Sequence, residues 1–595
     1  MKKLTHLMIF IAALLLSCRE NPKSIQSGSG DEAFQKLSDE FISGYLAWRP
    51  EFSVYLGFHE YDGKTSDLRK ESIENELARL KSYDQILNQL DTALLSPGMY
   101  YDFRILQSGI RNEIFNIEDV ESYTKNIEEV TSYTKNPMSY ANALDVSTYI
   151  KRNFSPLEDR LRSIITIENK APEIFAVAKS NLADSLAKPL IETAIQIVKG
   201  YEEFLEGDLI IAFKEVKNDS LMAVFQTANK KAIFELKEYA EYLEKEKLPK
   251  AHNNYALGRD KYQKMLLYGE GISISPERIL EIGLAELEKE KNVFNSAAKI
   301  INPNKKPIEV YHDLQKEHPI SDSLISEVKK NVEGIHHFLV GKKIISIPSE
   351  VRVQVKETPK YNRYRSTASL DPPMPFEMKA TESYYYITPV DPKWTLKQKE
   401  DWLSLFNYYY NVISTIHEVY PGHYTQFLHL KTSSATKIEK IFWSYAFVDG
   451  WAHYTEKMMI DEGYGNTGDP IITAKYRLAQ SSASLLRLCR LCVSIKMHCE
   501  GMSVDDATKF FMDNWYPGEK PSRQEAIRGI FDPGYLYFSL GKLMILKLRE
   551  DYQKQEGANF SLQKFHDQLL DNGMPPIRLL RERLLKDKNK WDKII

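Results

Sequence analysis

Apolar residues recur every three to four positions along most of the chain, with charged residues between them. This spacing places one apolar stripe on a helix, so residues 34–291 are predicted to form helix after helix, with few strand signals. The pattern breaks at residues 258–276, where glycines precede a serine-proline pair suited to capping a new helix. We therefore predict an N-terminal helical region at residues 33–265 and a second helical region at residues 266–595.

Residues 344–392 depart from the helical spacing. Residues 351–356 alternate strictly between apolar and polar types, and residues 383–387 are aromatic and β-favouring between proline-rich segments. The pattern predicts a mainly α fold that carries one small antiparallel sheet. The edge of such a sheet could hold an extended peptide by strand addition, although a purely structural hairpin fits the pattern equally well.

A capping box opens the next predicted helix, because Gln398 stands three positions after Thr395. Apolar residues then follow on one face of this helix: Trp402, Leu405, Phe406, Tyr409, Ile413 and Ile416. Continued along the chain, the same helix would carry His417 and Glu418 at its end.

The first residues have the pattern of an export signal. Two lysines precede an apolar run at residues 7–16, which is too short for a membrane span, and a Ser-Cys pair follows it. This end resembles a lipobox, so residues 1–18 are predicted to be a lipoprotein signal peptide in which Cys18 is lipidated, and residues 19–32 a solvated tether. We expect an exported protein that is lipid-anchored to a bacterial membrane and faces the periplasm or the cell surface. An uncleaved anchor or an ordinary signal peptide is the alternative.

The charge balance argues against a nucleic-acid partner. The 79 basic and 82 acidic residues give a formal net charge of −3, without the positive excess that binds phosphate backbones. Three further cysteines, Cys489, Cys492 and Cys499, lie in one helical pattern. They could belong to a metal or redox site, but the run lacks the second half of a zinc-site spacing. We interpret them as small buried side chains.

The strongest chemical signal is the segment 417–423, His-Glu-Val-Tyr-Pro-Gly-His, which has two residues more than the zincin pattern His-Glu-x-x-His. Histidines six positions apart on a regular helix are rotated by roughly 240° and cannot bind one ion. Pro421 interrupts helical hydrogen bonding and Gly422 tolerates unusual backbone geometry. We therefore predict that regular helix is lost between Tyr420 and Gly422, so that the two histidines converge.

Zinc at a catalytic site takes three protein ligands and a water molecule, so His417 and His423 need a third partner. Asp449, His453 and Glu456 are spaced so that they share one stripe of a helix that is otherwise apolar. A buried polar stripe needs partners, and a metal ion is one of the groups that can satisfy it. We predict Glu456 as the third ligand, with Asp449 and His453 supporting the ligands. An ordinary buried salt-bridge network fits this stripe equally well when it is taken alone.

Glu418 directly follows the first histidine, where the glutamate of zincins accepts a proton from the attacking water. We therefore predict Glu418 as the general base. In a rival arrangement a new helix begins at Pro421, and His429 or His453 replaces His423 as a ligand.

The two motifs together, His-Glu-x-x-Pro-Gly-His and Gly-Trp-Ala-x-Tyr-x-Glu, resemble those of the bacterial family called domain of unknown function 885 (DUF885). The resemblance includes residues 50–62 and 532–543 and so extends over nearly the whole mature chain. That family looks like an extended-motif branch of the gluzincin peptidases, similar in logic to the dipeptidyl peptidase III family. The resemblance implies zinc and a large multi-helical, metallopeptidase-like fold, with the small sheet near an active-site cleft.

By this resemblance His417, His423 and Glu456 match the metal ligands, Glu418 matches the base, and Gln426 matches a glutamine that follows the motif.

Three positions depart from the family pattern: Asp449 replaces a common glutamate, His453 a common leucine and Phe538 a frequent tyrosine. The donor for a tetrahedral oxyanion therefore has several candidates. Those with suitable side chains are Tyr535, His498, Tyr537 and Arg528.

These features predict a zinc-dependent hydrolase that cleaves peptide bonds with metal-activated water. Its partner would be a peptide or peptide-like substrate, and it would contact the membrane only through the N-terminal lipid. Two other functions fit parts of the pattern. One is a lipid-anchored helical substrate-binding protein without catalysis, and the other is a zinc amidohydrolase that acts on a non-peptide amide.

Overall fold

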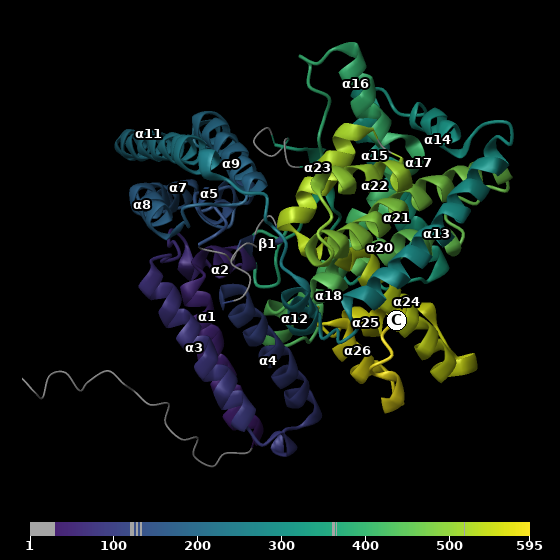
Figure 1. The fold of residues 1–595 in the computed structure, drawn as a ribbon, viewed down its shortest axis with the longest axis horizontal. Helices are drawn as coiled ribbons and strands as arrows, with labels where there is room; N and C mark the ends of the chain where they lie inside the picture. Colours follow the sequence, from purple (N-terminus) through teal and green to yellow (C-terminus); the bar gives the residue numbers. More distant parts are fainter. Residues whose placement is uncertain are drawn as a thin grey trace, which may run out of the picture.

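The structure is a computed structural model that describes residues 30–118, 124–126, 129–130, 134–359, 363, 366–516 and 518–595. Helices dominate the described chain, which confirms the mainly α fold class (Figure 1). The predicted signal peptide, Cys18 and most of the predicted tether lie outside the described residues.

The N-terminal helices form one side of the molecule and are coloured purple to blue in Figure 1. The helix α1 begins inside the predicted tether. These helices are α1 (Gly30–Trp48), α2 (Pro50–Leu56), α3 (Lys70–Gln89), α4 (Pro97–Glu118), α5 (Met138–Ala141), α6 (Thr148–Lys151), α7 (Leu157–Glu168), α8 (Ala171–Asn181), α9 (Lys188–Glu206), α10 (Asp208–Ala212) and α11 (Asp219–Tyr242). The short strands β1 (Thr124–Asn126) and β2 (Glu129–Val130) pair antiparallel between α4 and α5.

The remaining helices form the larger side of the molecule. They are α12 (Arg259–Glu270), α13 (Pro276–Ile301), α14 (Pro307–Gln315), α15 (Leu324–Lys342), α16 (Leu396–Leu403), α17 (Tyr408–Glu418), α18 (His423–Thr432), α19 (Lys437–Ile441), α20 (Tyr445–Asp461), α21 (Pro470–Cys499), α22 (Val504–Trp515), α23 (Glu519–Phe531), α24 (Tyr537–Glu556), α25 (Leu562–Leu570) and α26 (Ile577–Leu584).

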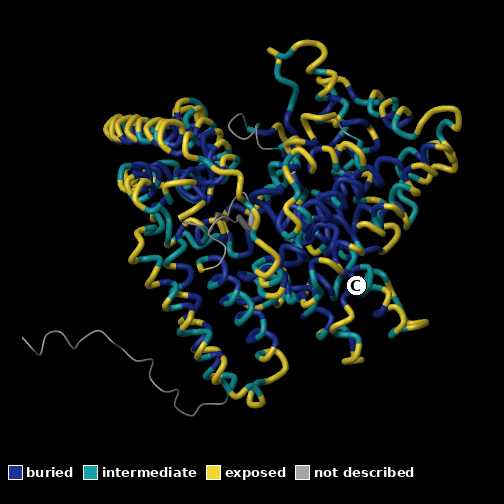
Figure 2. The backbone as a smooth tube through the Cα atoms, in the orientation of Figure 1, coloured by how far each residue is buried: buried dark blue, intermediate teal, exposed yellow. Residues whose placement is uncertain are grey.

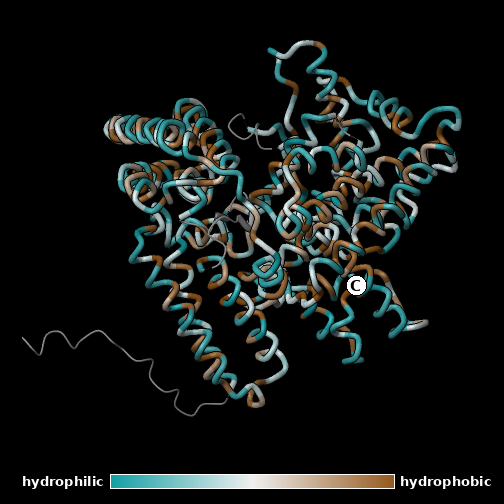
Figure 3. The backbone as a smooth tube through the Cα atoms, viewed as in Figure 1, coloured by the Kyte–Doolittle hydropathy of each residue, from teal (hydrophilic) through white to brown (hydrophobic). Residues whose placement is uncertain are grey.

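The core of the larger side is built around α21, a helix of 30 residues that is buried along most of its length and packs along α13. Buried backbone gathers around α20, α21 and α24 in Figure 2, and apolar residues gather in the same region in Figure 3. Burial of this apolar surface is the main stabilising contribution to such a core. The core therefore surrounds the helix that carries the predicted polar stripe.

Two glycines let α20 and α24 approach until their backbones touch. A Cβ atom at Gly541 would lie 1.8 Å from the carbonyl oxygen of Ala446, and one at Gly450 would lie 2.6 Å from the backbone of Gly541. Any side chain at these positions would push the helices apart. This close contact fixes α20 against α24.

The sheet has three strands, β3 (Gln354–Glu357), β4 (Ala368–Asp371) and β5 (Tyr384–Ile387). Strand β5 lies in the middle, antiparallel to β4 but parallel to β3. The predicted antiparallel pairing is thus correct for β4 and β5 and wrong for β3 and β5. The chain reverses at β4 and reverses again before β5 enters the centre, so the first and last strands run in the same direction.

One continuous helix was predicted from Thr395 to Glu418. This prediction is wrong, because the helix is interrupted. The capping box at Thr395 is present, but α16 ends at Leu403 and passes into a 3-10 turn. Asn407 then caps a new helix, α17, because its side chain accepts a hydrogen bond from the amide of Tyr410. The site motif therefore rests on a short, separately capped helix.

The predicted boundary between residues 265 and 266 falls within α12. The main apolar core contains residues from both sides of this boundary, and a second cluster joins α1 and α4 to Ile438, Phe442 and Leu579. No helix in the described part of the chain combines the length and apolarity needed to cross a bilayer.

Candidate metal centre

The helix carrying His417 ends one residue after it, and a new helix begins at His423. The four intervening residues include a cis Tyr420–Pro421 bond and the non-helical backbone of Gly422. A Cβ atom at Gly422 would lie 1.8 Å from the carbonyl oxygen of His417, so only glycine fits this close approach. The predicted loss of regular helix is confirmed, and it extends from Val419 to Gly422.

The interruption brings the two histidines of the motif together. Their ring centroids lie 4.9 Å apart, with the ring planes at 88° to each other. Asp449 on α20 faces them, with Oδ1 3.7 Å from Nε2 of His423. Donor atoms of His417, His423 and Asp449 all lie within 4.8 Å of one another, and no other such group occurs in the described part of the chain.

Glu456, predicted as the third ligand, contacts the opposite side of the first histidine. Its Oε1 lies 2.8 Å from Nδ1 of His417 and 3.0 Å from Nη2 of Arg487, and its Oε2 lies 3.1 Å from Nδ1 of His453. The carboxyl is fully buried, and burial would raise its pKa. The charge of Arg487 and the contact with His453 outweigh burial and lower that pKa below its usual range. Glu456 is therefore a buried anion that orients His417.

A buried lysine completes this polar group. Lys542 on α24 places Nζ 3.2 Å from Nε2 of His453 and 3.2 Å from Oγ of Ser484. Burial lowers the pKa of Lys542, and burial also holds the pKa of His453 well below its usual range. His453 and Glu456 of the stripe thus form one hydrogen-bonded network with Lys542 and Arg487, whereas Asp449 faces the histidines of the motif.

Glu418 points toward the small sheet. Its Oε2 accepts a hydrogen bond of 3.1 Å from the backbone amide of Leu370 in β4. Burial raises the pKa of Glu418 to about 8, although the Leu370 amide opposes that shift. Because the Leu370 amide is directed at Glu418 and not at β5, one edge of the sheet adjoins the site, as predicted.

Burial is also the largest influence on the pKa values of the other ionisable groups of the site. It raises the pKa of Asp449 to about 7 and lowers the pKa of both His417 and His423 well below their usual value. Both imidazoles are therefore neutral near pH 7, the form in which histidine binds a metal.

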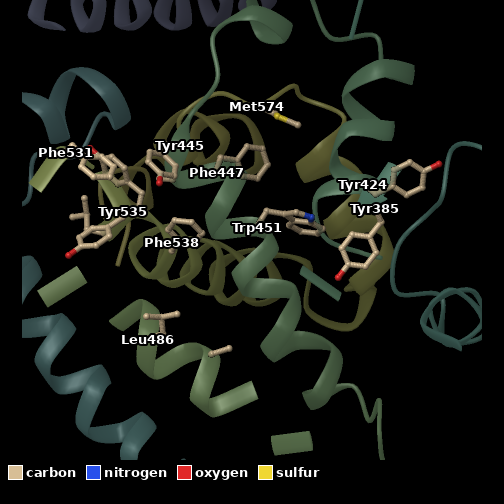
Figure 4. Close-up of a cluster of buried hydrophobic side chains, with 14 of the residues drawn as sticks. Tyr385, Tyr424, Tyr445, Phe447, Trp451, Leu486, Phe531, Tyr535, Phe538 and Met574 are labelled. Atoms are coloured by element: carbon tan, nitrogen blue, oxygen red, sulfur yellow. The ribbon is translucent and has the colours of Figure 1, made fainter. Parts of the chain in front are cut away.

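Phe538, which stands where a tyrosine is frequent, lies against the centre. Its ring is 6.4 Å from the ring of His417 and nearly parallel to it, and it packs edge-on against Tyr445 at 5.9 Å (Figure 4). The tyrosine hydroxyl expected from the family pattern is absent at this position.

Two of the residues predicted to donate a hydrogen bond to the oxyanion, Tyr535 and His498, are packed inside the protein. Tyr535 is fully buried, and its hydroxyl packs so tightly on Gly529 that a Cβ there would lie 2.4 Å away. His498 uses both ring nitrogens on backbone groups, accepting from the amide of Leu257 and contacting the carbonyl of Gly529 at 2.7 Å. His498 therefore keeps no free ring nitrogen, whereas the Tyr535 hydroxyl has no hydrogen-bond partner in the described part of the chain but is fully buried against Gly529.

His429, the ligand of the rival arrangement, is also engaged elsewhere. Its two ring nitrogens contact Asp571 at 2.8 Å and the carbonyl of Ser346 at 2.9 Å.

Cys489 and Cys492 are buried and unpaired in α21, and burial raises the pKa of both thiols.

The sequence interpretation missed Arg487 and Lys542, which neutralise Glu456 and support His453. Each stands in a buried stretch of its helix, and a charged side chain in such a stretch indicates a specific partner. For Arg487 that signal is present in the apolar run around residues 485–495.

The fold and the site define a large helical protein with a two-histidine, carboxylate-rich candidate metal centre. The family model described as "Bacterial protein of unknown function (DUF885)" matches residues 50–584, so this chain belongs to that family. The fold is similar to that of a candidate lipoprotein of unknown function from Shewanella oneidensis, with 23% identity, a TM-score of 0.76, and coverage of 93% of this chain and 100% of that one.

A candidate lipoprotein from Colwellia psychrerythraea shows the same fold, with 18% identity, a TM-score of 0.76, and coverage of 95% of this chain and 99% of that one. No curated protein shows significant similarity to this chain.

Proposed function

We propose that this protein is a zinc-dependent hydrolase that cleaves peptide bonds, with Glu418 as the general base. The observation that carries the proposal is the convergence of His417, His423 and Asp449 beside Glu418. Two neutral imidazoles and a carboxylate are a ligand set typical of catalytic zinc. The residues present therefore fit the metal.

Asp449, rather than Glu456, fits the third ligand position best. Asp449 shares a small space with both histidines, whereas Glu456 holds Nδ1 of His417 and leaves Nε2 of that ring for the metal. A carboxylate bonded to the outer nitrogen of a ligand histidine is a common support for zinc, because it fixes the ring and its tautomer. In this assignment His453 and Arg487 hold the supporting carboxylate, and Lys542 holds His453.

Zinc at this position would polarise the scissile carbonyl and lower the pKa of water. Glu418 would take the proton of the attacking water and deliver it to the departing amine. The Leu370 amide holds one carboxylate oxygen of Glu418, which leaves the other oxygen for that proton. Burial raises the pKa of Glu418, which makes it a stronger base once the positive charge of bound zinc favours its ionised form.

The small sheet supports a peptide substrate. Strand β4 lies at one edge of the order β3-β5-β4, and its residue Leu370 contacts the base. An extended peptide can pair with such an edge through its backbone, which would align a peptide bond with Glu418.

We also propose that Cys18 is lipidated and anchors the protein to a membrane. The lipobox-like segment supports this proposal, as do the names of the two similar structures, which are both described as candidate lipoproteins.

The test is metal analysis of the purified protein together with digestion of a peptide mixture and sequencing of the products. We expect about one zinc per chain and cleavage at peptide bonds. Glu418→Gln should keep the zinc and lower turnover by several orders of magnitude. A protein that binds no zinc, or a Glu418→Gln variant that still cleaves peptides at the native rate, would refute the proposal.

A further inference from the structure

Three arginines surround the ring of Phe538, next to the candidate metal centre. The guanidinium carbon of Arg490 lies 5.3 Å from the ring centroid, and those of Arg487 and Arg528 each lie 5.8 Å from it. The same ring stacks 6.4 Å from His417. Consecutive Cα atoms of a peptide are about 3.8 Å apart. Each guanidinium therefore lies within roughly three residue lengths of the His417 ring, measured by way of the Phe538 ring.

Two of these arginines are held by acidic side chains, and Arg528 also donates from Nη2 to the hydroxyl of Tyr445 at 3.5 Å. Arg490 uses Nε and Nη2 on the two carboxylate oxygens of Glu525, at 2.7 and 2.8 Å. Arg528 uses Nε and Nη2 on Asp532, at 3.0 and 2.9 Å. Within the described part of the chain, Nη1 of each arginine has no hydrogen-bond partner.

The third arginine differs from the other two. Arg487 donates to the carbonyl of Ala483 and contacts Glu456, so it belongs to the supporting network of the metal centre. Arg490 and Arg528 contact neither a metal-ligating residue nor Glu418. Their side chains are 10% and 26% exposed, so both guanidinium groups are largely shielded but keep some contact with solvent.

We propose that Arg490 and Arg528 bind the free C-terminal carboxylate of the substrate, which makes the protein a carboxypeptidase that removes one or two residues. The inference rests on the proposed peptidase function and deepens it. A guanidinium is a fork of N–H donors that matches a carboxylate, and a fork fixed by a neighbouring acid loses little conformational freedom on binding. Hydrolysis then breaks the C–N bond near the chain end, with water supplying OH to the carbonyl carbon and a proton to the amine.

The alternative role is purely structural, in which the two arginines only neutralise Glu525 and Asp532. Such pairs would stabilise the helices α21 and α23 without touching substrate. The two roles differ in one measurable respect: only the first makes binding depend on whether the substrate ends in a carboxylate or in an amide.

The experiment compares N-acetyl-trialanine with its C-terminal amide. Binding to the zinc-loaded Glu418→Gln variant is measured by calorimetry, which needs no turnover. We expect the acid to bind about 10- to 100-fold more tightly than the amide, as for the loss of charge-assisted hydrogen bonds. Native enzyme should release residues from the C-terminus of free-acid peptides, and mass spectrometry of the products identifies the bond cleaved.

The preference should disappear when each ion pair is removed as a pair, in Arg528→Met/Asp532→Asn and in Arg490→Met/Glu525→Gln. Removing both partners avoids a buried acid without its arginine. The control is Arg523→Met on α23, the helix of Arg528, because within the described residues Arg523 pairs with the exposed Asp505 at 2.7 Å and no other acid.

Equal binding of acid and amide, no binding of either, or a preference that survives in both double variants would overturn the inference. Release of N-terminal residues, or equal cleavage of acid and amide, would overturn it while leaving the peptidase proposal intact. Absence of zinc or of any peptide cleavage would instead count against the proposed function.

Discussion

Substitution of the two α20 carboxylates should separate a metal ligand from its support. Asp449→Asn removes a charged donor from the group formed with His417 and His423, whereas Glu456→Gln removes the anion that holds Nδ1 of His417. If Asp449 is the ligand, the first change should impair zinc binding more than the second, and the second should impair stability more than the first.

The expected magnitudes follow from these contacts. Loss of a group that only orients a ligand lowers metal affinity by about 10- to 100-fold, or about 1.4–2.8 kcal/mol. Loss of a ligand should lower it further. Glu456 is fully buried between Arg487 at 3.0 Å and two histidines, so its neutralisation leaves a buried guanidinium without its anion. Breaking such a pair destabilises a protein by about 3–5 kcal/mol. Among the residues that the structure describes, no cation lies within hydrogen-bond distance of Asp449, so Asp449→Asn should change the free energy of unfolding of the metal-free protein much less.

Zinc affinity can be measured by titration against a competing chelator, and stability by denaturant unfolding of the metal-free variants. His429→Ala is the matched control, because that histidine bonds Asp571 and Ser346 instead of the centre and should leave zinc binding nearly unchanged. If Glu456→Gln abolishes zinc binding while Asp449→Asn retains it, Glu456 is the ligand and the assignment from the structure is wrong.

Three further outcomes are expected. Cys18→Ser should move the protein from the membrane fraction to the soluble fraction without changing its unfolding curve, and unchanged pelleting would argue for a different anchor. Gly541→Ala should destabilise the protein by about 1–3 kcal/mol, because its Cβ would lie 1.8 Å from a backbone oxygen, whereas Gly341→Ala in open space should not. Burial would lower the pKa of His59, but its two carboxylate partners raise it to about 9. Burial would raise the pKa of Glu377, but His59 and two backbone amides lower it to about 2. Charged His59 therefore adds stability that is fully present below pH 6.5 and lost as the pH rises through about 9, and Glu377 adds stability that is present above pH 4.5 and lost as the pH falls through about 2. Unfolding midpoints measured across these ranges should lose the alkaline dependence in His59→Gln but keep part of the acidic one, because two backbone amides still hold Glu377. A variant that keeps the full native pH profile would contradict the assignment.

The break in the site helix could be predicted because it follows from local covalent properties. Pro421 lacks an amide proton and Gly422 lacks a Cβ, so the sequence alone indicates where the helix must yield. The break at Asn407 was missed, since an asparagine that caps a helix looks like any polar residue beside an apolar stripe. The direction of β3 was missed for a different reason. The direction of a strand in a sheet depends on how the chain reverses between strands. The alternation of apolar and polar residues within a strand does not indicate those reversals.

The identity of the third ligand lies beyond local reasoning because it depends on which face of α20 meets which neighbour. Asp449, His453 and Glu456 share one stripe, and spacing alone makes any of them a candidate. The choice is made by α21 and α24, which bring Arg487 and Lys542 to the far end of the stripe. A cation near a buried carboxylate favours its charged form and competes with a metal ion for its oxygens. Glu456 meets that competition, whereas no cation in the described part of the chain lies within hydrogen-bond reach of Asp449. We therefore propose that the helices that bury the stripe leave its first carboxylate open to a metal.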